Sequence, residues 1–90
     1  MVDIVFQRDK HRAVALNEGN RIGECTFSDT GKVWIIDHTE VSSEYSGQGI
    51  ARRLVDTIVY EARKEGIKLA ATCPYALKVF KEDKYKDILV

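Results

Sequence analysis

The chain has 90 residues, 44% of them hydrophobic and 31% charged, and its 14 basic side chains balance its 14 acidic ones. This composition predicts one soluble domain, residues 1–90, with a single hydrophobic core. The neutral balance gives no reason to expect nucleic acid or a membrane surface as a partner. No apolar run approaches the roughly 20 residues that cross a bilayer, and the N-terminus does not resemble a signal peptide. We therefore expect a cytoplasmic protein.

The two cysteines, Cys25 and Cys73, are too few for a disulfide framework and are expected to be reduced thiols. The two cysteines and two histidines are scattered without the spacing of metal ligands. The sequence therefore predicts no metal site.

The first forty residues read as strands joined by turns. Apolar runs at 12–16, 21–27 and 33–41 are separated by turn-forming residues at 17–20 and 28–31, which predicts three antiparallel strands. A shorter apolar run precedes them at 4–6. Apolar residues do not alternate at the start of 33–41, so that strand is expected to be covered on both faces.

A long amphipathic helix is predicted over 48–65, with an apolar stripe of helical period and Gly66 after its last turn. A buried strand at 67–73 follows, and the strand–helix–strand order makes it parallel to 33–41. Pro74 suits the first position of a second helix, predicted over 75–83. The expected fold is α/β (α+β), a mixed sheet of about five strands with two helices.

The segment from Ser46 to Ala51, Ser-Gly-Gln-Gly-Ile-Ala, lies between the strand and the long helix. The first N–H groups of a helix have no intrahelical partner, and the helix dipole adds positive charge there. Glycines let the main chain approach a phosphate closely. A phosphorylated ligand is therefore the preferred interpretation, with charge supplied by Arg52 and Arg53, against the alternative of a plain tight turn. The spacing matches neither G-x-G-x-x-G nor a P-loop.

This turn, together with Thr39-Glu40-Val41, Leu54 and Ala62-Arg63, resembles the acetyl-CoA-binding core of the GNAT superfamily of N-acetyltransferases. His38, Cys73-Pro74-Tyr75 and the ending at 85–89 extend the resemblance to small stand-alone GNAT-like proteins. Those proteins lack the N-terminal helices that build much of the acceptor site in longer members. The resemblance covers nearly the whole chain and implies a truncated GNAT-like fold.

The resemblance also implies the ligand and its contacts. Acetyl-CoA is the expected cofactor, its pyrophosphate wrapped by a motif of Arg or Gln, two residues, Gly, one residue, then Gly or Ala. Ser46 stands in the first position, Gly49 in the glycine position and Ala51 in the last. The implied cofactor-binding residues are Ser46, Gly47, Gln48, Gly49, Ile50, Ala51 and Arg52, together with Val41, whose main chain pairs with pantetheine. Ser46 departs from the usual Arg or Gln, and main-chain donors remain.

Three side chains are candidates for catalysis. Cys73, before a helix, is either a thiol able to accept acetyl or a small buried residue. His38 and Glu40 point to one side of a strand and are either general bases or a solvated face, while Asp37 and Thr39 point to the other side. Tyr75 and Tyr85 are interpreted as packing residues, with a general acid as the alternative.

Two acetyl-CoA-binding functions remain open, beside a weaker third alternative, an interaction domain whose glycine turn binds no ligand. One is N-acetyl transfer from acetyl-CoA to an unidentified amine, assisted by Cys73. The other is a non-catalytic acetyl-CoA-binding or sensor module, favoured by the missing acceptor-side helices and by Ser46.

Overall fold

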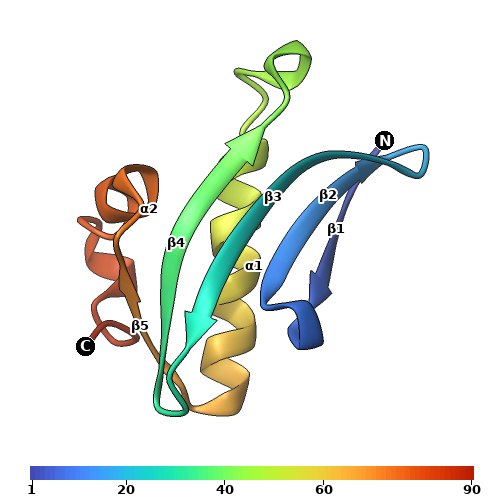
Figure 1. Ribbon diagram of the computed structural model, residues 1–90. Helices are drawn as coiled ribbons and strands as arrows, with labels where there is room; N and C mark the ends of the chain where they lie inside the picture. Colours follow the sequence, from blue (N-terminus) through green and yellow to red (C-terminus); the bar gives the residue numbers. More distant parts are fainter.

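The computed structural model describes residues 1–90 as a five-stranded mixed sheet with one long helix across a single face (Figure 1). The elements are β1 (Val2–Gln7), β2 (Arg12–Asn17), β3 (Asn20–Asp29), β4 (Val33–Val41), α1 (Ile50–Glu65), β5 (Lys68–Ala71) and α2 (Pro74–Val79). Short 3₁₀ turns occupy Arg8–Lys10, Ser43–Tyr45 and Asp83–Tyr85. The mixed sheet with two helices confirms the predicted fold class.

The strands lie in the sheet in chain order, β1 to β5. The first four are antiparallel neighbours joined by short connections, and β5 pairs with β4 in parallel through the crossover helix α1. That parallel ladder covers only Val33 to Ile36 on β4. Beyond Ile36 the main chain of β4 has no strand on its β5 side, so the two strands separate toward the end of β4.

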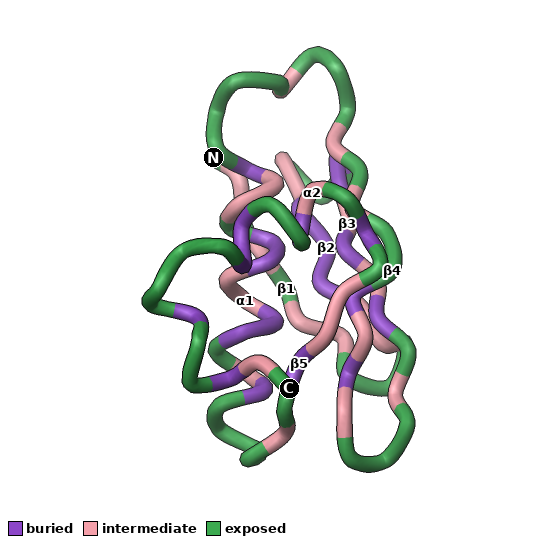
Figure 2. Tube along the Cα trace, turned by 90° about the vertical axis from the view of Figure 1, so that its left-hand side faces the viewer, coloured by how far each residue is buried: buried purple, intermediate pink, exposed green.

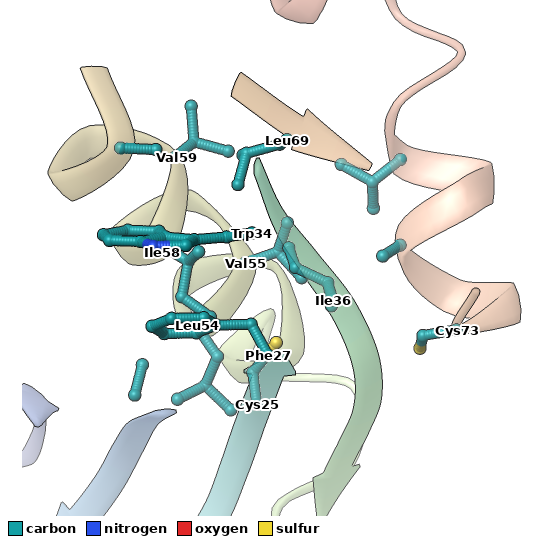
Figure 3. Packing of buried hydrophobic residues seen from close by; sticks show 14 of the residues in the cluster. Cys25, Phe27, Trp34, Ile36, Leu54, Val55, Ile58, Val59, Leu69 and Cys73 are labelled. Carbon is teal, nitrogen blue, oxygen red and sulfur yellow. The ribbon is translucent and has the colours of Figure 1, made fainter. Parts of the chain in front are cut away.

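Helix α1 forms because its apolar residues repeat at helical spacing and bury one continuous face. Its buried residues are Ile50, Leu54, Val55, Ile58, Val59 and Ala62. They pack on core residues of the strands, including Phe27, Trp34 and Ile36 (Figure 3). Gly66, at φ +70°, ends the helix in the left-handed conformation that suits glycine. Figure 2 shows the buried residues concentrated where α1 faces the sheet.

Two predicted boundaries near the C-terminus are wrong. The last strand stops at Ala71, because the N–H groups of Thr72 and Cys73 both turn to the carbonyl of Ile36. The second helix stops at Val79 rather than at residue 83. Phe80 and Tyr85 both enter the core with ring centroids 5.4 Å apart, and residues five apart on a helix point in different directions.

The predicted facing of Asp37 is also wrong. Thr26 pairs with His38 but Phe27 pairs with Ile36, so Asp37 is the extra residue of a β-bulge. Its carboxylate accepts hydrogen bonds from the hydroxyls of Thr26 and Ser28. The bulge places Asp37 on the same face as His38 and Glu40, the face that no helix crosses (Figure 1).

Tyr85 fastens the C-terminal segment to α1. Its side chain is almost fully buried, its hydroxyl donates to Asp56, and it accepts a hydrogen bond from Arg52 Nε at 2.9 Å. Burial, supported by the bond to Asp56, raises the pKa of Tyr85. The packing interpretation of this tyrosine therefore agrees with its position.

Replacing Tyr85 with phenylalanine is expected to lower the free energy of unfolding by about 1 kcal/mol, because the hydrogen bonds are lost while the ring stays packed. Since the raised pKa favours the neutral phenol in the folded state, this contribution is present below pH 10.0 and is lost as the pH rises above it. Urea unfolding from neutral to alkaline pH checks this. If the free energy of unfolding of wild type and of Tyr85→Phe depended identically on pH above pH 10, this expectation would be contradicted.

Candidate functional site

A groove of about 290 Å³ opens where β4 separates from β5, at the start of α1. Its lining combines the end of β4, the loop after it, the first turn of α1 and the first turn of α2. The lining residues are Val41, Tyr45, Ser46, Gly47, Gly49, Ile50, Ala51 and Tyr75. The glycine turn and the last residue of β4, predicted from the sequence to be neighbours in a binding site, are thus walls of one groove.

The main chain of the glycine turn presents a row of unused donors. The first helical hydrogen bond of α1 runs from the N–H of Arg53 to the carbonyl of Gly49. No N–H group from Gly47 to Arg52 donates to a protein acceptor, and no side chain caps the helix. These unpaired groups, with the partial positive charge of a 16-residue helix behind them, are the features that anion sites at helix N-termini have in common.

Both glycines of the turn adopt left-handed backbone conformations, Gly47 at φ +78° and Gly49 at φ +76°. A Cβ at either position would meet no protein atom within 4 Å. Glycine is therefore needed here for backbone geometry, and the space in front of the turn is open to a ligand.

The neighbouring arginine side chains are bound elsewhere. Arg52 donates to Tyr85 and, through Nη2, to Glu82 at 2.9 Å, and Arg53 donates to the carbonyl of Val2 at 3.1 Å. Neither guanidinium is directed by these contacts toward the turn. Arg52 does not line the groove, and the group that it leaves unpaired beside the turn is its main-chain N–H, so the free donors of this region belong to the main chain.

Cys73 occupies the N-cap position of α2 and is buried beside β4 (Figure 3). Its Sγ lies 3.5 Å from Thr39 Oγ1, and that hydroxyl donates to Cys25 Sγ at 3.3 Å. Burial alone would raise the pKa of Cys73, but the Thr39 hydroxyl and the N–H groups of Ala76 and Tyr75 outweigh it, so the pKa is lowered. Burial raises the pKa of Cys25 to about 12. Of the two thiols, Cys73 is the one that ionises more easily.

Replacing Thr39 with valine is expected to raise the pKa of Cys73, because valine has no hydroxyl to turn from Cys25 and donate its hydrogen to the Cys73 thiolate. The measurement is the pH dependence of alkylation by iodoacetamide, whose midpoint should move upward. Thr39→Ser keeps the hydroxyl and is the matched control. An unchanged midpoint in Thr39→Val would refute the role assigned to this hydrogen bond.

His38 and Glu40 are adjacent to each other, with His38 Nε2 3.1 Å from Glu40 Oε1, and both are exposed. They lie on the open face of the sheet, whereas Thr39 pairs with buried Cys25 and faces α1. The structure therefore separates the three catalytic candidates into His38–Glu40 on one face of β4 and Cys73 on the other.

Two residues of the groove region were missed from the sequence. Thr39, named there only as part of the family resemblance and for the face it occupies, contributes the hydroxyl that contacts both thiols. Tyr45 lines the groove while its hydroxyl accepts a hydrogen bond from Asn17 at 2.8 Å. Tyr45 could have been identified from the sequence as an aromatic residue within an otherwise polar loop.

The structure brings no three His, Cys, Asp or Glu side chains together in a way that could hold a metal ion. None of its helices combines the length and the apolar character that crossing a membrane requires.

The fold and groove define a class of α+β protein in which a glycine turn offers main-chain donors beside two separating parallel strands. A family model described as GCN5-related N-acetyl-transferase matches residues 12–88. The chain therefore belongs to the GCN5-related N-acetyltransferase (GNAT) family, as the sequence resemblance implied. No curated relative matches the chain.

Solved structures share this fold to different extents. The solution structure of a GCN5-like protein from Staphylococcus aureus is 31% identical, covers 98% of this chain and 87% of its own, and has a TM-score of 0.75. The ribosomal-protein-alanine N-acetyltransferase of Brucella melitensis is 28% identical over 70% of this chain, with a TM-score of 0.61. A GNAT family acetyltransferase from Elizabethkingia anophelis, solved with acetyl-CoA bound, is 19% identical over 67% of this chain, with a TM-score of 0.60.

These neighbours differ in length. The match covers 49% of the Brucella chain and 40% of the Elizabethkingia chain, so this protein spans less than half of either. The activities in the names of these two proteins are therefore properties of those proteins.

Proposed function

We propose that residues 1–90 act as one acetyl-CoA-binding domain that transfers the acetyl group to an amine. The observation that carries this proposal is the row of unpartnered N–H groups from Gly47 to Arg52 at the mouth of the groove. The neighbour from Elizabethkingia anophelis with acetyl-CoA and the N-acetylglutamate synthase of Neisseria gonorrhoeae with coenzyme A share the fold. A diphosphate is the group that such a turn suits best.

In this arrangement the pyrophosphate lies against the turn formed by Ser46 to Ala51 and receives hydrogen bonds from its main chain. The pantetheine arm then follows the edge of β4 left free beyond Ile36, where the main chain at Val41 pairs with it as an added strand would. Following that edge inward brings the thioester toward Thr39 and Cys73.

The transfer forms an N–C bond between the amine and the thioester carbonyl carbon and breaks the C–S bond. The amine proton passes to Glu40 or His38, directly or through water, and the leaving thiolate of coenzyme A takes up a proton. Alternatively, the Cys73 thiolate first attacks the carbonyl, releasing coenzyme A, and the amine then attacks the acetyl-cysteine. Holding both reactants in place is the main catalytic contribution in either route.

An amide NMR titration with acetyl-CoA tests the binding half of the proposal. Shifts are expected from Gly47 to Arg52, at Val41 and at Cys73, while the distant β3–β4 hairpin around Gly31 should not respond. Unchanged turn amides at millimolar acetyl-CoA would refute it. Mass spectrometry of wild type and Cys73→Ala after incubation with acetyl-CoA tests the thiol route, which requires a 42 Da adduct, the mass of acetyl replacing hydrogen, on the wild type alone.

A non-catalytic acetyl-CoA sensor is the second candidate. The observation that favours it is the connection between β1 and β2, which consists of the short turn Arg8–Lys10 and no acceptor-side helix. A turnover assay with a broad amine panel separates the two functions, because the sensor binds acetyl-CoA without consuming it.

A further inference from the structure

A second hollow, of about 390 Å³, lies on the face of the sheet that α1 does not cover. It is formed where the start of β3 passes the end of β4. Its lining residues are Arg21, Ile22, Gly23, Glu24, Glu40 and Ser42. Ile22 is the single apolar side chain among them, so the hollow suits a small polar molecule rather than an apolar one.

This hollow and the groove lie back to back across the end of β4. Glu40 and Ser42 line the hollow, and Val41, the residue between them, lines the groove. Successive residues of a strand point to opposite faces, so the two spaces are separated by the thickness of one strand. Beyond Ile36 the edge of β4 has no strand on its β5 side, so the amine of a molecule next to Glu40 would reach the thioester around this free edge rather than through the strand.

The charges that line the hollow have both signs. Arg21 Nη1 lies 3.4 Å from Glu24 Oε1, while its Nε and Nη2 have no protein acceptor. Glu24 also contacts Arg12 at 3.4 Å, and Glu40 contacts only His38, through Oε1, which leaves Oε2 unpaired. One guanidinium and one carboxylate oxygen are thus available to a ligand in the same hollow.

The register of the strands adds a further constraint. Glu24 and Glu40 are directly opposite on β3 and β4, and like charges in that position destabilise a sheet. Arg12 and Arg21 compensate Glu24 but no arginine contacts Glu40. An ammonium group beside Glu40 would neutralise the charge of that carboxylate. An anion beside Arg21, on the other side of the hollow, would pair with the guanidinium.

We propose that the hollow binds the acetyl acceptor and selects a free α-amino acid, whose carboxylate pairs with Arg21 and whose amine lies at Glu40. This specificity rests on the proposed function, since it names the amine that receives the acetyl group. Arg21 is the specificity-determining residue: a forked guanidinium recognises a carboxylate in two hydrogen bonds. The same guanidinium repels a diamine, which carries a second positive charge.

Binding is tested by amide NMR titration with two amino acids, L-serine and L-glutamine, and with their C-terminal amides, in the absence and presence of coenzyme A. At least one amino acid should shift the amides of 21–24 and 40–42 and bind about tenfold or more tightly than its amide, because the amide lacks the charged group that pairs with Arg21. Putrescine should bind no better than the amides. Three results would overturn the proposal. They are equal affinity for the amino acids and their amides, tighter binding of putrescine than of the amides, and no response to either amino acid.

Variants separate this proposal from the cofactor site. Arg21→Gln should reduce amino-acid affinity to that of the amide, Arg21→Lys should restore part of it, and Lys32→Gln in the β3–β4 hairpin is the surface control. All three should keep the acetyl-CoA shifts from Gly47 to Arg52. If those shifts are absent in the wild type, the proposed function fails; if they are present and Arg21→Gln binds the amino acid as the wild type does, only the acceptor assignment fails.

Discussion

Replacing Gly49 with alanine is expected to weaken acetyl-CoA binding at least tenfold while the protein remains folded. Gly49 lies at φ +76° with open space beyond its Cα, so the new methyl group both strains the turn and enters the volume assigned to the diphosphate. Left-handed backbone at a non-glycine residue costs about 1–2 kcal/mol. A domain of this length has roughly 5–13 kcal/mol of stability, so the fold survives. Calorimetric titration with acetyl-CoA measures the loss.

Gly31 provides the matched control. It lies at φ +94°, also with nothing within 4 Å of a Cβ, but in the hairpin that precedes β4, at the opposite end of that strand from the groove. Gly31→Ala should therefore carry a similar cost in thermal stability and leave acetyl-CoA affinity unchanged. Equal affinities for the two variants would show that the glycine turn does not contact the ligand.

Replacing Leu54 with alanine is expected to cost about 2–5 kcal/mol of unfolding free energy, the largest stability effect considered for this chain. Leu54 is fully buried in α1, and α1 is the helix that covers the sheet. The truncation removes apolar contacts and leaves a cavity that the surrounding strands fill only in part. For a domain of this size the melting temperature should fall by roughly 10 °C or more.

Lys64→Ala, on the exposed side of the same helix, is the control and should change stability by no more than about 0.5 kcal/mol. Because both variants place alanine in one helix, helix propensity does not explain a difference between them. A loss below 1 kcal/mol in Leu54→Ala would contradict the central role of α1 in the core. Denaturant unfolding of the two variants supplies the comparison.

Much of the fold could be predicted from local pattern. The apolar stripe from Ile50 to Ala62 and the glycine at 66 predicted α1, because helical periodicity and a left-handed cap are properties of consecutive residues. The hairpins and the parallel crossover followed from turn composition and element order. The boundaries after Ala71 and Val79 could not be predicted, because Ile36, Phe80 and Tyr85 set them through contacts between distant segments.

For the candidate site, too, local features could be predicted from the sequence and contacts between distant segments could not. The turn's donors were predictable, since the first N–H groups of any helix have no intrahelical partner, while the absence of a capping side chain was a finding of the structure. The positions of the side chains could not be predicted in this way. The bulge at Asp37 decides which residues of β4 share a face. The Arg52 side chain donates hydrogen bonds to Glu82 and Tyr85 rather than pointing to the turn.

The sequence by itself determined the strand–turn–helix unit, the reading of the turn as an anion site and the resemblance to the GNAT superfamily, because each depends on residues next to one another in the chain. Only the tertiary structure decided that Thr39 joins Cys25 and Cys73, and that Glu40 faces a second hollow with Arg21 and Glu24. Those groupings depend on strand register, and one extra residue in a strand moves every later side chain to the other face.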